Sequence, residues 1–220
     1  MATQSKKNKQ VTKIDILTYY MEYVLEHEAT PKSVFKFAKD HNFEEADFYK
    51  YFGNFDALKK NIWETFFSNA HELMMKNEEV QSYGSREKML TFFYTFFEIL
   101  TANRSYVLYV LDENEQSLKN LNQLKGLRSN IKTFATDLIE DDNDEKQYGF
   151  LKRNEKIYSE GAWIQFLFLL KFWKEDSSPD FEKTDIAIEK SVNTIFDVFD
   201  NTPLEKVFDL GKFLYKETMK

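Results

Sequence analysis

Residues 30–58 read TPKSVFKFAKDHNFEEADFYKYFGNFDAL and begin with a short segment that ends at a polar break. Thr30 followed by Pro31 is typical of a helix start, in which an N-cap residue precedes a proline in the first turn. This start predicts a helix that continues to Lys39. The polar residues 40–42, Asp-His-Asn, are expected to end that helix.

A second short helix is expected over about residues 44–51. A longer helix follows the break at Gly53 and Asn54, with Asn54 as its cap. Upstream, apolar residues repeat at helical spacing and predict an amphipathic helix over about residues 12–27. Two short helices that are joined by a tight turn and braced by a third helix form a helix-turn-helix. The second helix of such a motif can enter the major groove of DNA.

Four motifs follow one another without a gap along this part of the chain: Ser33-Val34, Phe37-Ala38, Tyr49-Lys50-Tyr51-Phe52 and Asp56-Ala57-Leu58. In this order they resemble the N-terminal domain of the TetR family of transcriptional regulators. In that family a Thr/Ser-Val pair opens the second helix and an apolar-Ala pair closes it. A Tyr-x-Tyr/His-Phe motif ends the recognition helix before a Lys-Glu-x-Leu motif opens the fourth helix. The resemblance covers about residues 12–67.

The resemblance implies an all-α, TetR-like organisation. A flexible basic arm over residues 1–11 precedes a three-helix helix-turn-helix domain over 12–53. Residues 54–220 form a larger helical domain, with helix 54–77 as the connector. In the family, the larger domain binds a small apolar effector and its last long helices form a dimerising four-helix bundle. The composition also favours helices, because 22 Phe and 12 Tyr accompany only 6 Gly and 3 Pro.

Long segments with helical periodicity fill the chain beyond Gly84. The helices are expected over about residues 85–101, 105–112, 115–140, 151–174, 181–200 and 203–216. The last of them starts with the capping box Thr202-Pro203-Leu204-Glu205. The acidic run EDDNDEKQ, residues 140–147, predicts a solvated connector.

The second and third helices carry the residues that we expect to contact palindromic operator DNA. These residues are Lys32, Ser33, Lys36, Glu45, Asp47, Tyr49 and Lys50. Asn42 stands at the turn glycine of the family, a tolerable change because Asn enters left-handed conformations more easily than most residues. Acids occupy positions 44, 45 and 47, where the family often has Ser, Lys and Thr, and Phe55 replaces a phosphate-contacting Lys.

These acids bear directly on DNA binding, because phosphate contacts dominate affinity. The chain has a formal charge of −7, of which residues 1–63 contribute +1. The candidate DNA-binding end is therefore the less acidic one, but it lacks a dense basic patch. A carboxylate can accept a hydrogen bond from cytosine N4, so an acidic recognition helix is compatible with sequence-specific binding. The other reading is that the helix-turn-helix persists as a scaffold after loss of DNA binding.

Aromatic side chains recur on three helices of the larger domain. A pocket for an apolar small molecule would be lined by some of Phe93, Phe96, Tyr106, Tyr109, Trp163 and Phe166. Aromatic residues at helical spacing more often form plain core, and this reading stays open for each of them. The run over residues 162–170 is apolar in every direction and must be covered on all sides. We therefore expect a homodimer interface with Phe168, Phe172, Ile188, Val192, Ile195 and Phe199.

Several chemistries have no suitable residues in this sequence. There are no cysteines, and the helix His71-Glu72-Leu73-Met74-Met75 lacks the second histidine of a zinc-binding HExxH motif. The 6 glycines are isolated, so no glycine-rich phosphate loop exists. We expect no enzyme activity, no metal and no cofactor. The most apolar run is too short for a membrane span, and the N-terminus lacks an export signal, which predicts a soluble, cytoplasmic protein.

Three functions fit these observations. The first is a ligand-responsive TetR-type regulator, which the lysine-bearing arm and the intact aromatic register favour. The second is a TetR-fold protein that binds an apolar ligand, lipid or quinone-like, and has lost DNA binding, which the acidic recognition helix favours. The third is a structural dimer whose aromatic core holds nothing. We expect the regulator.

Overall fold

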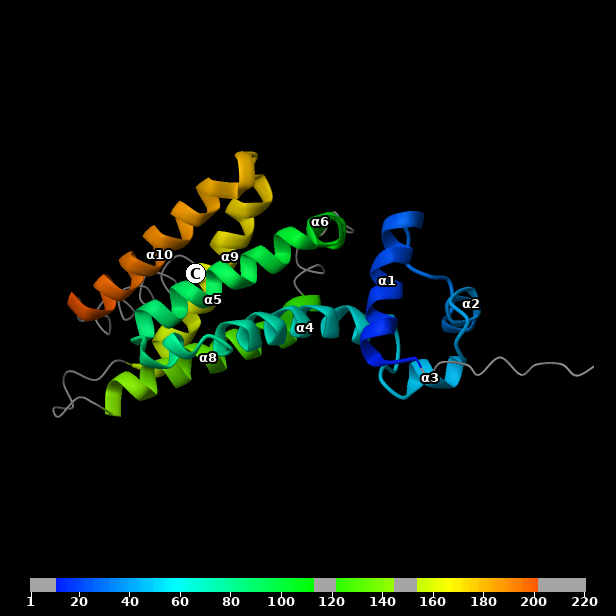
Figure 1. Ribbon diagram of the computed structural model, residues 1–220, viewed down its shortest axis with the longest axis horizontal. Helices are drawn as coiled ribbons and strands as arrows, with labels where there is room; N and C mark the ends of the chain where they lie inside the picture. The colour runs from blue at the N-terminus through cyan, green and yellow to red at the C-terminus, as the bar shows by residue number, and fades with distance from the viewer. Residues whose placement is uncertain (1–10, 113–121, 145–153, 202–220) are drawn as a thin grey trace, which may run out of the picture. The chain divides into compact units, whose positions relative to one another are not determined.

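The computed structural model describes residues 11–112, 122–144 and 154–201 (Figure 1). All regular structure within these ranges is helical, as predicted. The elements are α1 (Lys13–His27), α2 (Val34–Asp40), α3 (Glu45–Tyr49), α4 (Phe55–Met75), η1 (Glu78–Ser82), α5 (Ser85–Ala102), α6 (Arg104–Asp112), η2 (Asn122–Leu124), α8 (Lys125–Asp144), α9 (Glu155–Glu175), η4 (Pro179–Phe181) and α10 (Glu182–Asn201). The predicted arm before residue 11, the start of the helix at 115–140 and the helix at 203–216 lie outside the described residues.

The chain divides into two compact units, each built from two segments. Unit 1 combines Met1–Ser68 with Glu98–Leu127, and unit 2 combines Asn69–Phe97 with Arg128–Lys220. This division differs from the predicted domain boundary at residue 53, because three of the long helices, α4, α5 and α8, contribute residues to both units.

Local side-chain caps determine where the first helices of unit 1 begin. Thr12 and Asp15 form a capping box, in which Thr12 Oγ1 accepts from the Asp15 N–H at 3.2 Å and the Asp15 carboxylate accepts from the Thr12 N–H at 2.9 Å. The predicted start of α2 at Thr30 and Pro31 is wrong. Ser33 is the N-cap instead, because its extended backbone lets Oγ accept from the Lys36 N–H at 3.2 Å.

The turn between α2 and α3 depends on Asn42, whose φ of 57° confirms the left-handed conformation expected there. The Asn42 N–H donates to the Lys39 carbonyl at 3.3 Å, and the Phe43 N–H donates to the Ala38 carbonyl at 3.0 Å. This pair of bonds is a Schellman motif, which satisfies the last carbonyls of α2. The predicted cap of α4 is confirmed, since Asn54 Oδ1 accepts from the Ala57 N–H at 2.8 Å.

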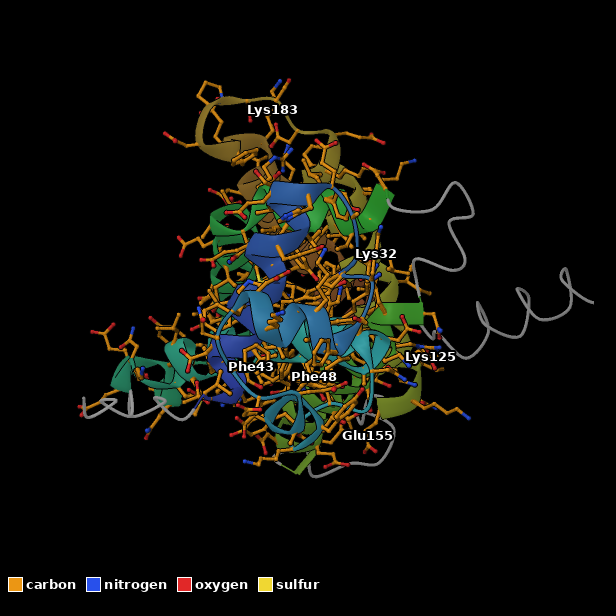
Figure 2. The ribbon with its side chains drawn as sticks, turned by 90° about the vertical axis from the view of Figure 1, so that its right-hand side faces the viewer. Lys32, Phe43, Phe48, Lys125, Glu155 and Lys183 are labelled. Atoms are coloured by element: carbon orange, nitrogen blue, oxygen red, sulfur yellow. The ribbon has the colours of Figure 1, made fainter. Side chains whose placement is uncertain are left out.

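Phe37 of α2 lies at the centre of the helix-turn-helix core. Its ring packs against Phe43 in the turn, Phe48 of α3 and Phe55 of α4, with centroids 5.7, 6.4 and 5.6 Å away. Figure 2 labels two of these rings, Phe43 and Phe48. Tyr20 of α1 packs on the same ring at 6.3 Å. Edge-on contacts of this kind bury a large apolar area in the core of the helix-turn-helix.

A buried polar chain joins the rest of unit 1. The Trp63 indole N–H on α4 donates to Gln123 Oε1 at 3.1 Å, and Gln123 Nε2 donates to the Val110 carbonyl of α6 at 3.0 Å. Gly126 allows a close approach nearby, because a Cβ atom there would lie 1.9 Å from Glu64 Oε1. These contacts tie α4, η2 and the end of α6 together.

The core of unit 2 is aromatic, and α8 ends later in the chain than the sequence suggested. Phe92 of α5 packs against Phe134 of α8 with ring centroids 4.7 Å apart. The prediction of a solvated acidic connector from residue 140 is wrong for residues 140–144, because α8 continues through them. Asn143 is buried, and the Ser85 hydroxyl lies 2.5 Å from Asp142 Oδ1, so this acidic turn packs on the start of α5.

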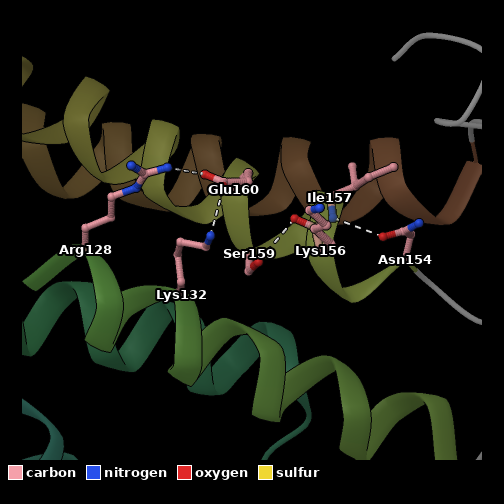
Figure 3. A network of polar contacts seen from close by, with 7 residues as sticks. All are labelled: Arg128, Lys132, Asn154, Lys156, Ile157, Ser159 and Glu160. Carbon is pink, nitrogen blue, oxygen red and sulfur yellow. Dashed lines mark hydrogen bonds and ion pairs between the residues drawn. The ribbon is translucent and has the colours of Figure 1, made fainter. Parts of the chain in front are cut away.

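Ion pairs join α8 to α9 in unit 2 (Figure 3). Glu160 of α9 accepts from Lys132 Nζ at 2.6 Å and from Arg128 Nη2 at 2.9 Å, and both partners belong to α8. Hydrogen bonds from Lys132 and Arg128 lower the pKa of Glu160 against the opposing effect of burial. The start of α9 is capped by Asn154, whose Oδ1 accepts from the Ile157 N–H at 3.1 Å.

Candidate nucleic-acid interface and dimer surface

The third helix presents a polar face to solvent. Phe48 is fully buried and anchors α3, whereas Tyr49 is 53% exposed. Lys50, directly after the helix, and Tyr51 are exposed as well. Because the buried side of α3 is aromatic and the outer side polar, this short helix can meet a partner without losing its core contacts.

The charged and polar side chains in and directly after α3 contact one another. Lys50 Nζ donates to Asp47 Oδ1, and this hydrogen bond and charge raise the pKa of Lys50. Tyr49 Oη lies 3.4 Å from Glu45 Oε1. Desolvation, followed by the charge of Glu45, raises the pKa of Tyr49. The predicted DNA-contacting residues in and directly after α3 therefore form two pairs, Lys50 with Asp47 and Tyr49 with Glu45.

The predicted contacts at the start of α2 are also exposed. Lys32 and Lys36 are exposed to solvent, and Ser33 serves as the N-cap. Sequence reasoning missed Phe35, which is 62% exposed on the same helix. Phe35 lines a shallow hollow between α2 and α3 together with Glu44 and Glu45. The signal available in the sequence was an aromatic residue that stands among lysines.

An apolar groove lies between α9 and α10 in unit 2. Its volume is about 940 Å³, and its lining includes Ile164 and Phe168 of α9 and Ile186 of α10, which are 64%, 55% and 48% exposed. Gln165 Nε2 donates to Ser191 Oγ at 3.0 Å and links the two helices beside it. Apolar surface of this extent is typical of a protein interface.

The comparisons with known proteins identify the family. Residues 88–214 match the family described as Tetracyclin repressor-like, C-terminal domain, and the match covers more than half of the chain. The chain belongs to the TetR family. A search of curated proteins found no match. The TetR match lies in the part of the chain for which the sequence had offered only a similar layout of helices.

The α9 and α10 helices of this TetR-family chain divide the predicted interface residues into two groups. Phe168, Phe172, Ile195 and Phe199 line the groove. Ile188 and Val192 are fully buried instead, which corrects their expected place at the interface. The reason is the broad apolar stripe of α10, one edge of which faces the core of the unit. Ile164 and Ile186 line the groove but were not predicted. For Ile164, the signal was the largely apolar run over residues 162–170.

The pocket residues that were predicted from the sequence of this TetR-family chain fall in both units. Phe93, Phe96, Trp163 and Phe166 are buried in unit 2, and Phe166 packs against Phe96 and Trp163 at 5.6 and 5.3 Å. Tyr106 and Tyr109 belong to unit 1. The ring contacts in unit 2 are those of a packed core, so a ligand there would have to separate rings that now touch.

Within residues 11–112, 122–144 and 154–201, no group of His, Cys, Asp or Glu side chains has the arrangement of a metal site. In the same ranges, no helix combines the length and the apolar character that a membrane span requires.

Proposed function

We propose that the chain is a ligand-responsive TetR-type transcriptional regulator that binds palindromic operator DNA as a homodimer. The observation that carries this proposal is the helix-turn-helix of unit 1, in which the Asn42 turn leaves the polar side of α3 exposed. Membership of a regulatory, non-enzymatic family supports it. The lysines at positions 32 and 36 supply charge for phosphate contacts beside α3.

The homodimer part of the proposal rests on the groove between α9 and α10. Half-exposed aromatic and aliphatic side chains such as Phe168 and Ile164 are costly to leave in water and would be covered by the same helices of a second copy. In such a two-fold dimer, the two copies of α3 are expected about 34 to 36 Å apart, one turn of B-DNA.

The effector part of the proposal concerns the aromatic side chains of the larger domain. An apolar small molecule suits the Phe93 and Phe166 region, because flat apolar rings line ligand cavities well. Such a ligand must displace existing ring contacts, and this requirement links binding to a rearrangement of α5 and α9. A role in gene regulation also implies a cytoplasmic location.

A second function remains favoured by one observation, the Lys50–Asp47 ion pair. In this pair, Asp47 already binds the lysine that would otherwise be offered to DNA at the end of α3. A TetR-fold protein that binds lipids or quinone-like molecules without DNA would have no need of that lysine.

Fluorescence anisotropy of the full chain with its own upstream DNA, from low to physiological salt, tests the proposal. The regulator reading expects saturable binding that exceeds binding to a scrambled duplex by at least about a thousandfold. Lys36→Ala should weaken binding to both DNAs and lower the salt slope by about one. An absence of binding at every salt concentration, together with an apolar molecule retained through purification, would favour the ligand-binding protein.

A further inference from the structure

The polar groups of α3 form contacts with one another rather than projecting independently. Lys50 Nζ donates to Asp47 Oδ1 at 2.5 Å, three residues earlier in the chain. Lys50 is the only Lys or Arg between residues 44 and 54. The one cation at the end of α3 that could meet a phosphate is therefore held by Asp47, a carboxylate of α3.

This ion pair is accessible enough to exchange partners. The Lys50 side chain is 57% exposed and the Asp47 side chain 20% exposed. Ion pairs at exposed positions contribute roughly 0 to 1 kcal/mol, so a phosphate can compete for the lysine. The carboxylate of Asp47 gains nothing from that exchange, because a phosphate is also negative. It is then left beside the DNA backbone without its counter-charge.

Base edges offer what phosphates lack. The amino groups of cytosine and adenine point into the major groove and donate hydrogen bonds that a carboxylate can accept. At a site with such an amino group opposite Asp47, the base becomes the new partner of Asp47 while a phosphate takes Lys50. Both members of the pair then keep a partner.

We propose that this exchange makes Asp47 a specificity-determining residue. Asp47 holds Lys50 back from the phosphates of non-specific DNA and releases it where a base amino group replaces the lysine. The inference rests on the proposed DNA-binding function and names the feature of the operator that α3 reads, an exposed base amino group. Thus the acid lowers affinity for bulk DNA more than for the operator.

The test compares wild type and Asp47→Asn on two labelled duplexes. One is a random-sequence duplex, and the other is the sequence that the wild-type protein enriches from a random library. Asn removes the charge but keeps an acceptor oxygen for the base. We expect affinity for the random duplex to rise about threefold to tenfold, with a salt slope steeper by about 0.9. Affinity for the enriched duplex should change by less than about twofold, so the specificity ratio falls.

Two further variants make the test selective. Asp47→Asn combined with Lys50→Ala should lose the gain on random DNA, because the gain acts through the freed lysine. Glu26→Gln on α1 changes the net charge equally at an exposed position outside α3. It should alter affinity for either duplex by less than about twofold.

Each outcome bears on one of the two proposals. Equal gains on both duplexes, a gain that survives the loss of Lys50, or no gain would overturn the role of Asp47 while leaving DNA binding intact. If neither wild type nor Asp47→Asn binds any duplex at any salt concentration, the regulator function fails and the inference fails with it.

Discussion

Asp176 and Thr184 bind through two hydrogen bonds, in which Asp176 Oδ2 accepts from the Thr184 N–H at 2.9 Å and from its hydroxyl at 2.7 Å. The other carboxylate oxygen accepts from the Ser178 N–H and hydroxyl, at 2.9 and 2.7 Å. One buried carboxylate thus joins the end of α9 to the start of α10. Asp180 and Phe181, with φ of 49° and 58°, occupy left-handed conformations between those helices.

Removal of this carboxylate should destabilise the connection between α9 and α10. Asp176→Ala leaves the buried Thr184 hydroxyl and N–H without their acceptor, and we expect a loss of about 2 to 3 kcal/mol in the free energy of unfolding. Urea unfolding followed by circular dichroism measures it. Asp180→Asn is the matched control, because Asp180 is exposed and Asn tolerates a left-handed backbone, and it should cost less than about 0.5 kcal/mol.

The same residue predicts a dependence of stability on pH. Burial alone would raise the pKa of Asp176, but the hydrogen bonds from Ser178 and Thr184 outweigh it and lower the pKa from 3.8 to about 2. Because the folded-state pKa lies below the unfolded one, the carboxylate contributes fully above about pH 4, and its contribution is lost as the pH falls towards 2. Asp176→Asn should remove about 1 to 2 kcal/mol of that acid-dependent loss. Identical pH profiles for the two proteins would contradict the assignment.

The Gln123 amide is expected to stabilise unit 1 through both of its bonds. Gln123→Leu removes the acceptor of the Trp63 indole and the donor to the Val110 carbonyl, and should cost about 1 to 3 kcal/mol. Thermal unfolding measures the loss. Combination with Trp63→Phe should cost less than the sum of the single changes, since each single change already removes the same Trp63–Gln123 hydrogen bond. Simple additivity would mean that the bond contributes nothing.

The turn before α3 should prefer glycine to any other substitute for Asn42. At φ 57°, Asn42→Gly is expected to keep the thermal midpoint, whereas Asn42→Val should cost about 1 to 2 kcal/mol. Differential scanning calorimetry of both variants makes the comparison. Equal midpoints for Gly and Val would show that the left-handed turn is not required.

The groove between α9 and α10 should control assembly. Phe168→Glu places a charge among exposed apolar residues of the groove and should raise the dimer dissociation constant at least about tenfold. Light scattering would then show the 26.3 kDa monomer at micromolar concentration. Leu73→Glu, at a half-exposed position of α4 outside the groove lining, should leave the mass unchanged. A wild-type monomer would contradict the proposed dimer.

Sequence reasoning succeeded where the controlling interactions are local. Asn54 caps α4, Asn42 turns the chain, and the register of aromatic residues around Phe48 is set within a few positions. It failed where two starts compete over a short distance, as at Thr30 and Ser33. Both residues are plausible caps, and only the backbone conformation selects Ser33.

Tertiary packing explains the other differences. The acids after residue 139 look solvated, but Asn143 is buried and Asp142 contacts Ser85, so the helix continues. On α10, periodicity alone does not tell which edge of an apolar stripe faces inward, and Ile188 and Val192 face the core. The pairing of Lys50 with Asp47 is local in sequence, yet counting the charges of the segment does not reveal which of them pair.

The apolar groove also affects the chain before it has met a partner. A newly synthesised copy carries Ile164, Phe168 and Ile186 in water, the form most exposed to chaperones, proteases and wrong associations. If assembly covers these side chains, the melting temperature rises with protein concentration. The expression level would then determine how long each copy of the protein persists as well as how many copies there are. A cell that makes few copies would lose a larger fraction of them to degradation.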